Sequence, residues 1–170
     1  MNVIKRIAPC LWFDHQAEEA AAFYVSVFKN SRILSVARYS KAGQETHRRP
    51  AGSVMTVAFE LDGQPFTALN GGPAFTFNEA VSMQVNCSNQ DEVDNYWDKL
   101  SKSGDPKAQQ CGWLKDKYGL SWQIVPTVLP ELLKDHDSPK AQRAMEALLR
   151  MKKIDIRELE RAAAGERVTA

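Results

Sequence analysis

The chain has 170 residues, of which 44% are hydrophobic and 25% charged, and its formal net charge is +1. This length predicts one domain or two small modules sharing one core, and the composition is ordinary for a globular protein. The near-neutral charge gives no electrostatic reason to expect a nucleic-acid partner. No apolar run approaches the roughly 18 residues of a membrane span, and we expect no signal peptide because Asp14 interrupts the first apolar segment. The three cysteines are widely spaced, which favours reduced thiols in a cytoplasmic protein.

The first part of the chain predicts one strand, one helix and three further strands. The first strand is expected over residues 4–13, where Pro9 favours an edge position or a bulge. Asp14 is the expected N-cap of a helix whose apolar face runs from Ala17 to Phe28. Asp62 and Gly63 form a strong hairpin-turn signal. The three strands that follow the helix are expected over residues 32–39, 54–61 and 65–69.

The same order of elements is expected again from residue 81. After a strand at 81–87, Ser88 or Asn89 caps a helix that runs to about Ser103. Three more strands are then expected, over residues 107–111, 113–115 and 120–125. This internal repeat predicts an α+β fold built from two similar modules, at about 4–72 and 80–126, each with an apolar sheet face to bury.

Residues 127–170 form a separate helical tail in this prediction. A helical turn is expected at 130–134, and Ser138 with Pro139 is a typical start for an amphipathic helix. Asp155 is expected to cap a second short helix, which Gly165 ends. The apolar faces of these helices must be covered, either by the chain's own sheet or by a second subunit.

Residues 111–123, Cys-Gly-Trp-Leu-Lys-Asp-x-Tyr-Gly-x-Ser-Trp-Gln, resemble the last hairpin of the PhnB-like branch of the vicinal oxygen chelate (glyoxalase/bleomycin-resistance) superfamily. That branch is also labelled as a demethylubiquinone 3-methyltransferase-like domain. The resemblance continues at residues 7–14 and 59–66 and covers about residues 4 to 126. It implies paired βαβββ modules that form an eight-stranded, incompletely closed barrel with a cleft inside. On this basis we expect one domain over 1–126, the C-terminal helices of 127–170, and a homodimer.

The resemblance also implies where a metal would bind. The metal enzymes of the superfamily use four His or Glu ligands, from the first and last strand of each module. In this chain those positions fall at about Pro9, at about Ala68, within 81–83 and at Gln123. Such residues are poor ligands for a divalent metal, so we predict no metal site and no cofactor. A methyltransferase reading is disfavoured too, because Asp14-His15-Gln16 after the first strand contain no glycine for binding S-adenosylmethionine.

Several polar or reactive residues are candidates for a site. By the resemblance, Asn70 and Gln123 are placed to orient a ligand through hydrogen bonds. Glu60 is a candidate acid or base, or else a solvated side chain. Cys10 is a candidate nucleophile, or else a small buried residue. Arg48 and Arg49 could bind an anion at the cleft mouth, or else belong to a solvated loop.

The tryptophans are the apolar candidates. Trp12 and Trp122, together with Trp113, could line a pocket for an aromatic ligand or could belong to the core. The favoured hypothesis is therefore a protein that binds a small apolar or aromatic molecule in the cleft without a metal. The alternative is an enzyme of the superfamily that acts on a small molecule, of the lyase, dioxygenase or transferase type. It would have a non-standard metal site or no metal, with Glu60 or Cys10 in its site. Demethylubiquinone 3-methyltransferase activity ranks below both.

Overall fold

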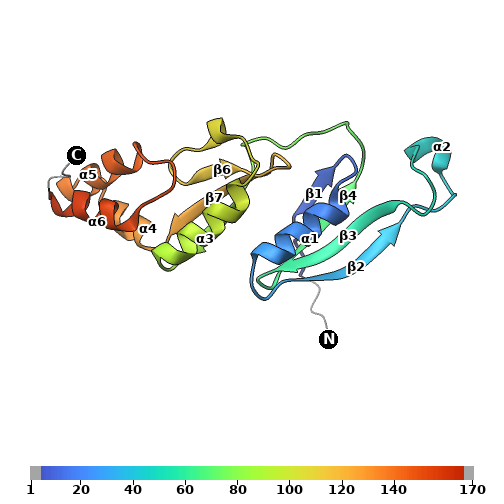
Figure 1. Cartoon of the computed structure of the whole chain (residues 1–170), viewed down its shortest axis with the longest axis horizontal. Coiled ribbons are helices and arrows are strands. Elements are labelled where there is room, and N and C mark those ends of the chain that lie inside the picture. The colour runs from blue at the N-terminus through green and yellow to red at the C-terminus, as the bar shows by residue number, and fades with distance from the viewer. Residues whose placement is uncertain (1–4, 167–170) are drawn as a thin grey trace. The chain divides into compact units, whose positions relative to one another are not determined.

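The structure is a computed structural model that describes residues 5–166. The chain divides into two compact units, Met1–Phe77 (unit 1) and Asn78–Ala170 (unit 2). Each unit contains one sheet with a helix packed on it (Figure 1).

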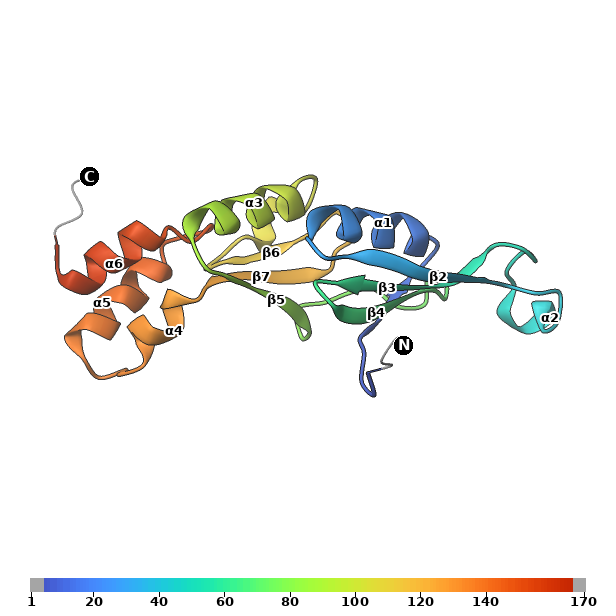
Figure 2. The same ribbon diagram turned by 90° about the horizontal axis from the view of Figure 1, so that it is seen from below.

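Unit 1 is a four-stranded sheet in the order β1-β4-β3-β2. β1 pairs in parallel with β4, and the other two pairings are antiparallel. Helix α1 (Ala17–Val27) lies along one face of this sheet (Figure 2), and the short helix α2 (Gln44–His47) lies in the loop between β2 and β3. The strands are β1 (Cys10–Phe13), β2 (Arg32–Arg38), β3 (Val54–Leu61) and β4 (Gln64–Asn70).

Side-chain alternation gives the sheet of unit 1 two different faces. The face covered by α1 carries the buried residues Leu11, Phe13, Val57, Phe59, Leu61, Phe66, Ala68 and Asn70. The opposite face, here called open face 1, carries Cys10, Trp12, Thr56, Ala58, Glu60, Pro65, Thr67 and Leu69. Most residues of open face 1 are half-buried.

Unit 2 confirms the predicted repeat except for one strand. Its sheet has the order β5-β7-β6, with β5 and β7 parallel, as in the β1-β4-β3 part of unit 1. Helix α3 (Gln90–Ser101) begins at Asn89, whose side chain accepts the Glu92 N–H as predicted. The strands are β5 (Ser82–Cys87), β6 (Trp113–Lys115) and β7 (Ser121–Pro126). Open face 2, on the side away from α3, carries Ser82, Gln84 and Asn86 of β5, Trp113 and Lys115 of β6, and Ser121, Gln123 and Val125 of β7.

The strand expected at 107–111 is absent from the described part of the chain. Pro106–Ala108 form a short 3-10 helix, η1, and Asp105 accepts the Lys107 N–H to begin it. Cys111 and Gly112 then make a two-residue turn with φ of 51° and 84°, leaving a single bridge between Gln110 and Trp113. A side chain at Gly112 would meet the Ile124 carbonyl at 2.8 Å, so glycine is required there.

Two predictions at the start of unit 1 were also wrong. Within the described residues β1 begins at Cys10 rather than at residue 4, and Pro9 contributes only its carbonyl, which accepts the Thr67 N–H at 3.0 Å. Asp14 does not cap α1: the N-cap is Gln16, which makes no side-chain cap bond, and Asn70 caps the helix from β4 instead.

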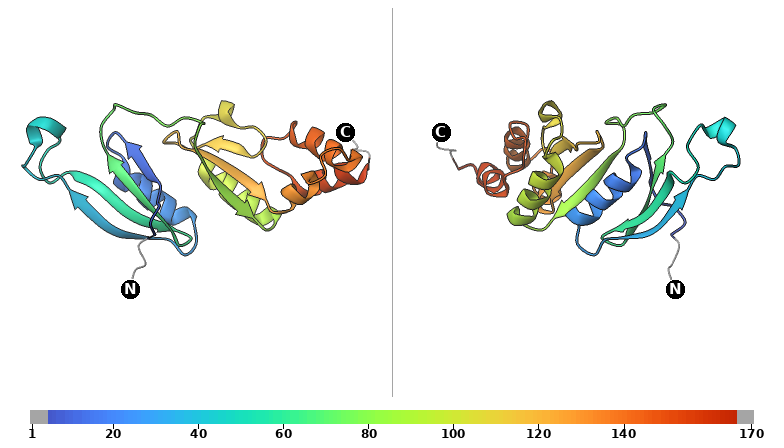
Figure 3. Two further views of the ribbon diagram at one scale, coloured as in Figure 1. Left: turned by 180° about the vertical axis from the view of Figure 1, so that it is seen from behind. Right: turned by 45° about the vertical axis from the view of Figure 1, so that its right-hand side comes forward.

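The C-terminal tail packs on unit 2 of its own chain. Helices α4 (Val128–Leu133), α5 (Pro139–Leu148) and α6 (Ile156–Ala164) gather beyond β7 (Figure 3), and Leu132, Ala144, Leu148, Ile154 and Leu159 form their common core. The predicted caps at Ser138, Asp155 and Gly165 are confirmed.

The tail is also hydrogen-bonded to the rest of the unit. The N–H groups of Cys111 and Gly112 donate to the carbonyls of Met151 and Lys152, at 2.9 and 2.8 Å. The Gln90 amide accepts the Ile156 N–H and donates to the Ile154 carbonyl. The core of the tail is thus formed within the same chain, whereas Met145 and Leu149 stay 40% and 58% exposed. None of the helices in residues 5–166 has the length and apolar character needed to cross a bilayer.

Candidate functional site

Trp12 is the largest side chain on open face 1, and the structure fixes its position. Its indole N–H donates to the Gly72 carbonyl at 2.8 Å. Its ring lies so close to Gly71 that a Cβ there would come within 2.2 Å of it, so only glycine fits. Phe75 packs edge-on against the ring, with 5.0 Å between centroids, while 64% of Phe75 stays exposed. Trp12 and Phe75 therefore form an ordered aromatic surface, here called the Trp12 ledge.

Asn70, a predicted ligand-binding residue, is 7% exposed and lies on the covered face. Its side-chain oxygen accepts the Ala17 N–H at 2.8 Å, and its side-chain nitrogen donates to the Val54 carbonyl at 3.1 Å. Its backbone carbonyl also accepts the Tyr39 hydroxyl at 2.7 Å. The amide thus joins α1, β3 and β4, and both of its ends are bonded to backbone.

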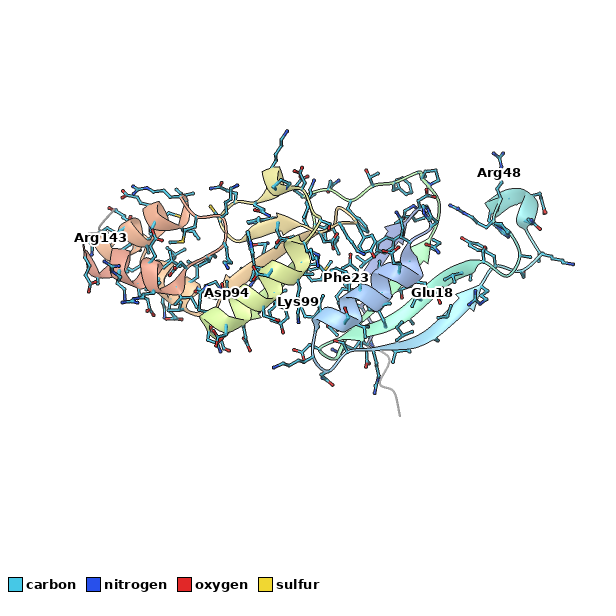
Figure 4. All side chains as sticks on the ribbon, in the orientation of Figure 1. Glu18, Phe23, Arg48, Asp94, Lys99 and Arg143 are labelled. Carbon is cyan, nitrogen blue, oxygen red and sulfur yellow. The ribbon has the colours of Figure 1, made fainter. Side chains whose placement is uncertain are left out.

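The two arginines of the β2–β3 loop behave differently. Arg49 folds back onto unit 1, donating to the Asp14 carbonyl and carboxylate at 3.2 and 3.3 Å. Arg48 follows α2 with a left-handed φ of 55°, and its side chain projects away from the sheet (Figure 4). The geometry favours a structural role for Arg49 and the solvated-loop interpretation for Arg48.

Gln123, the other predicted polar contact, lies on open face 2 and is half-buried. Its side-chain nitrogen donates to the Ser82 hydroxyl at 2.8 Å across the β5–β7 pairing. Trp113 lies opposite Gln123 on β6. The structure thus places Gln123 half-buried on open face 2, bonded to Ser82 of β5.

Trp122 lies on the opposite side of the same strand, under α3, and is 2% exposed. Its indole N–H donates to the Asp116 carboxylate at 2.8 Å. That carboxylate also accepts the backbone N–H groups of Tyr118 and Leu120, which closes the β6–β7 turn. The geometry therefore favours the core interpretation of Trp122 over the ligand-binding one.

Glu60 and Cys10, the candidate catalytic residues, both lie on open face 1. The Glu60 carboxylate is paired with the Arg32 guanidinium at 3.0 Å, across the β2–β3 pairing. Cys10 is exposed, so the alternative of a small buried residue was wrong, but partial desolvation by its surroundings still raises the pKa of its thiol above its ordinary value of 9.0. A thiolate nucleophile needs the opposite shift, so this direction gives no support to a nucleophilic Cys10.

The positions implied for a metal do not supply a suitable donor set. Ala68 lies on the covered face and is fully buried, because the alternation of β4 turns Thr67 and Leu69 toward open face 1. The placement of a ligand position at Ala68 was therefore wrong, and neither neighbour is a good divalent-metal ligand. Within residues 5–166, no three His, Cys, Asp or Glu side chains gather as a metal centre would require. We derive no chemical step through a metal.

Each module pairs its first and last strands in parallel, β1 with β4 and β5 with β7, and leaves one sheet face open. This is the fold of the vicinal oxygen chelate (glyoxalase) superfamily. The profile of the 3-demethylubiquinone-9 3-methyltransferase family matches residues 5–125, and the chain belongs to that family. Curated proteins gave no match.

One solved structure gives the same assignment, and others are similar in part. The PhnB protein from Bacillus cereus is 35% identical, with a TM-score of 0.61, over 72% of this chain and 100% of its own. Protein PA1353 from Pseudomonas aeruginosa is 17% identical, with a TM-score of 0.54, over 72% of this chain and 97% of its own. The fosfomycin resistance protein FosX from Listeria monocytogenes is 13% identical, with a TM-score of 0.48, over 76% of this chain and 98% of its own.

The family's description names a methyltransferase, but the residues of this chain do not fit the usual methyl-donor site. A doubly wound enzyme binds its cofactor at a glycine-rich loop between the first strand and the following helix. Here β1 is joined to α1 by Asp14, His15 and Gln16, and the sheet carries α1 on one face only.

Sequence reasoning missed three features of the open faces. Phe75 was given no role, although an aromatic residue three positions after Gly72 was a usable signal. Ser121 and Lys115 were not singled out at all. They become neighbours only through the register of β6 and β7, which no local pattern specifies.

Proposed function

We propose that this protein binds a small apolar or aromatic molecule on open face 1, against the Trp12 ledge. The exposed ring of Phe75 carries the proposal. It is a large apolar side chain, 64% exposed, yet it is held edge-on against a fixed indole. Exposed aromatic surface that is also ordered is typical of a ligand contact, because little side-chain entropy is lost on binding.

The rest of open face 1 supports an apolar ligand. Leu69 lies opposite Trp12 in the β1–β4 register, and Thr67 lies opposite Cys10. Ala58 pairs with Thr67 on β3, so the centre of this face consists of small or apolar side chains. The charged residues are the Arg32–Glu60 pair toward the β2 edge, and they neutralise each other.

The test is an affinity measurement with 2-naphthol as an uncharged aromatic probe and cyclohexanol as its non-aromatic counterpart. We expect Phe75→Ala to raise the Kd for 2-naphthol about five- to tenfold, the effect of one aromatic contact. Leu149→Ala is the matched control, because Leu149 is 58% exposed on the tail and should leave the Kd unchanged. Equal affinity in wild type and Phe75→Ala would refute the proposal.

We also propose that binding needs no metal, and that the protein is a cytoplasmic homodimer. Metal independence is supported by the donor chemistry at the implied ligand positions. The cytoplasmic location is supported by three cysteines that are free thiols, Cys10, Cys87 and Cys111. The dimer is an expectation of the family, and the core of the tail is formed within the chain. Light scattering at several concentrations tests the dimer, and metal analysis after loading and desalting tests metal independence.

A further inference from the structure

Open face 2 contains a buried hydroxyl group that the fold does not use. Ser121 is 1% exposed, and within the described chain its Oγ has no hydrogen-bond partner. Burying a hydroxyl without a partner costs free energy, so native proteins seldom retain one without a reason. The hydroxyl belongs to β7, a central strand, and not to a flexible loop.

The register of the sheet places two further donors beside Ser121. Ser82 on β5 and Lys115 on β6 are its direct partners in the two pairings. Residues paired directly across neighbouring strands point to the same face, with Cβ atoms about 5 Å apart. Ser82, Ser121 and Lys115 therefore form one row of donors across the three strands.

Gln123 leaves the Ser82 proton free to donate. Its side-chain nitrogen donates to the Ser82 oxygen at 2.8 Å, so this oxygen is an acceptor in that bond. The hydroxyl hydrogen of Ser82 can then be directed elsewhere. Two hydroxyl donors and one ammonium group are a combination suited to an anionic oxygen group.

The ammonium group of Lys115 already has a carboxylate partner in this chain. Glu79, in the segment before β5, forms an ion pair with Lys115 Nζ, and this bond lowers the pKa of the Glu79 carboxyl. The Lys115 side chain is 24% exposed, whereas that of Glu79 is 66% exposed. A mostly exposed carboxylate can leave the lysine at little cost, because surface ion pairs are weak.

We propose that Ser82, Ser121 and Lys115 bind the anionic oxygen group of a small molecule, and that Glu79 competes for Lys115 until the ligand displaces it. Gln123 is a positioning residue in this site, since it acts through Ser82. The nearby Asp116 carboxylate does not oppose an anion there, because it faces the other side of the sheet and accepts three N–H bonds. The proposal stands on unit 2 alone and does not rest on the binding proposed for open face 1.

The experiment is an NMR titration of the full chain with inorganic phosphate and, separately, with acetate, at constant ionic strength kept with sodium chloride. We expect saturable shifts of the amides of Ser82, Lys115 and Ser121. Comparing the two affinities shows whether the site prefers a tetrahedral phosphate-like group or a planar carboxylate. Non-saturable shifts with both anions would overturn the proposal.

Three variants make the test specific. Ser121→Ala and Lys115→Met should each raise the Kd of the more tightly bound anion about tenfold or more. That is the usual loss for a hydrogen bond to a charged group. Glu79→Gln should lower the Kd of that anion about threefold, because the carboxylate that competes for Lys115 is removed. A general charge effect would appear equally in the control Glu146→Gln, on the exposed side of α5. Unchanged affinity in Ser121→Ala, or equal effects of the two glutamate variants, would overturn the proposal. Ser121→Ala and Glu79→Gln remove no packing, so the test does not depend on whether Lys115→Met folds.

Discussion

Replacing Asn70 with alanine should destabilise unit 1 more than any other single polar substitution on its sheet. The side chain is 7% exposed, and both ends of its amide bond backbone groups of other elements. Alanine would leave the Ala17 N–H and the Val54 carbonyl without these partners. Each buried group that loses its partner costs about 1–3 kcal/mol.

The two losses are not equal. The bond to Ala17 is buried, whereas the bond to Val54 is partly buried, so water can compensate for the second more easily. We therefore expect Asn70→Ala to lower the free energy of unfolding by about 3 kcal/mol. Asn70→Asp keeps the acceptor at the N-terminus of α1, where the helix dipole favours a negative charge, but it loses the donor to Val54. We expect that variant to lose about 1–2 kcal/mol.

The assay is urea denaturation followed by circular dichroism, with amide exchange of Ala20 and Ala21 reporting on α1. Asn78→Ala is the matched control, because the Asn78 side chain also accepts a backbone N–H, from Ala80, but at an exposed position. We expect the control to change the free energy of unfolding by less than about 0.5 kcal/mol. If Asn70→Ala were as stable as the control, the structural role of Asn70 would be refuted and the ligand-binding prediction would gain support.

Three further predictions follow from charges and buried groups. The rate of iodoacetamide alkylation at Cys10, resolved by peptide mass spectrometry, should rise with pH to a midpoint above 9.0, because partial desolvation raises the pKa of this thiol; a midpoint near neutral pH would favour an enzyme. The hydrogen bond from Lys153 lowers the pKa of Asp94 and raises that of Lys153. The pair therefore stabilises the fold fully between the ordinary pKa values of 3.8 and 10.5. This stabilisation is lost as pH falls through the lowered Asp94 pKa or rises through the raised Lys153 pKa. Since both side chains are about 40% exposed, a double-mutant cycle at neutral pH should give less than about 1 kcal/mol, and a coupling of several kcal/mol would contradict the geometry. Ser121→Ala should leave stability unchanged or raise it by up to about 1 kcal/mol in urea denaturation without anions, because a buried hydroxyl without a described partner is removed; a clear loss would mean that the hydroxyl is bonded.

The parts of the fold that were predicted correctly are those with local signals. The alternation of apolar residues defines β3 over Val54–Leu61, and Asp62-Gly63 adopts the positive φ values that a tight hairpin turn needs. Asn89, Ser138 and Asp155 each accept the N–H three residues later, which is the bond that made them recognisable as caps.

The parts that were not predicted depend on partners far along the chain. Asp14 has the right residue type and place for a cap, but Asn70 provides the bond from 53 residues away. The assignment of Ala68 as a ligand position failed for a similar reason. It required the side of the strand to be known, and a shift of one residue changes that side. Trp122 and Trp113 could not be distinguished by composition either, and the β6–β7 register separates them into core and open face.

The missing strand of unit 2 and the C-terminal tail are best understood as one feature. In unit 1 the corresponding strand, β2, is a full edge strand whose seven residues are all exposed. In unit 2 the turn at Cys111-Gly112 stands in its place, and the N–H groups that a strand would have paired donate to Met151 and Lys152. Backbone donors at a sheet edge need partners, and here the segment between α5 and α6 provides them. The C-terminal helices therefore complete the second module of the same chain.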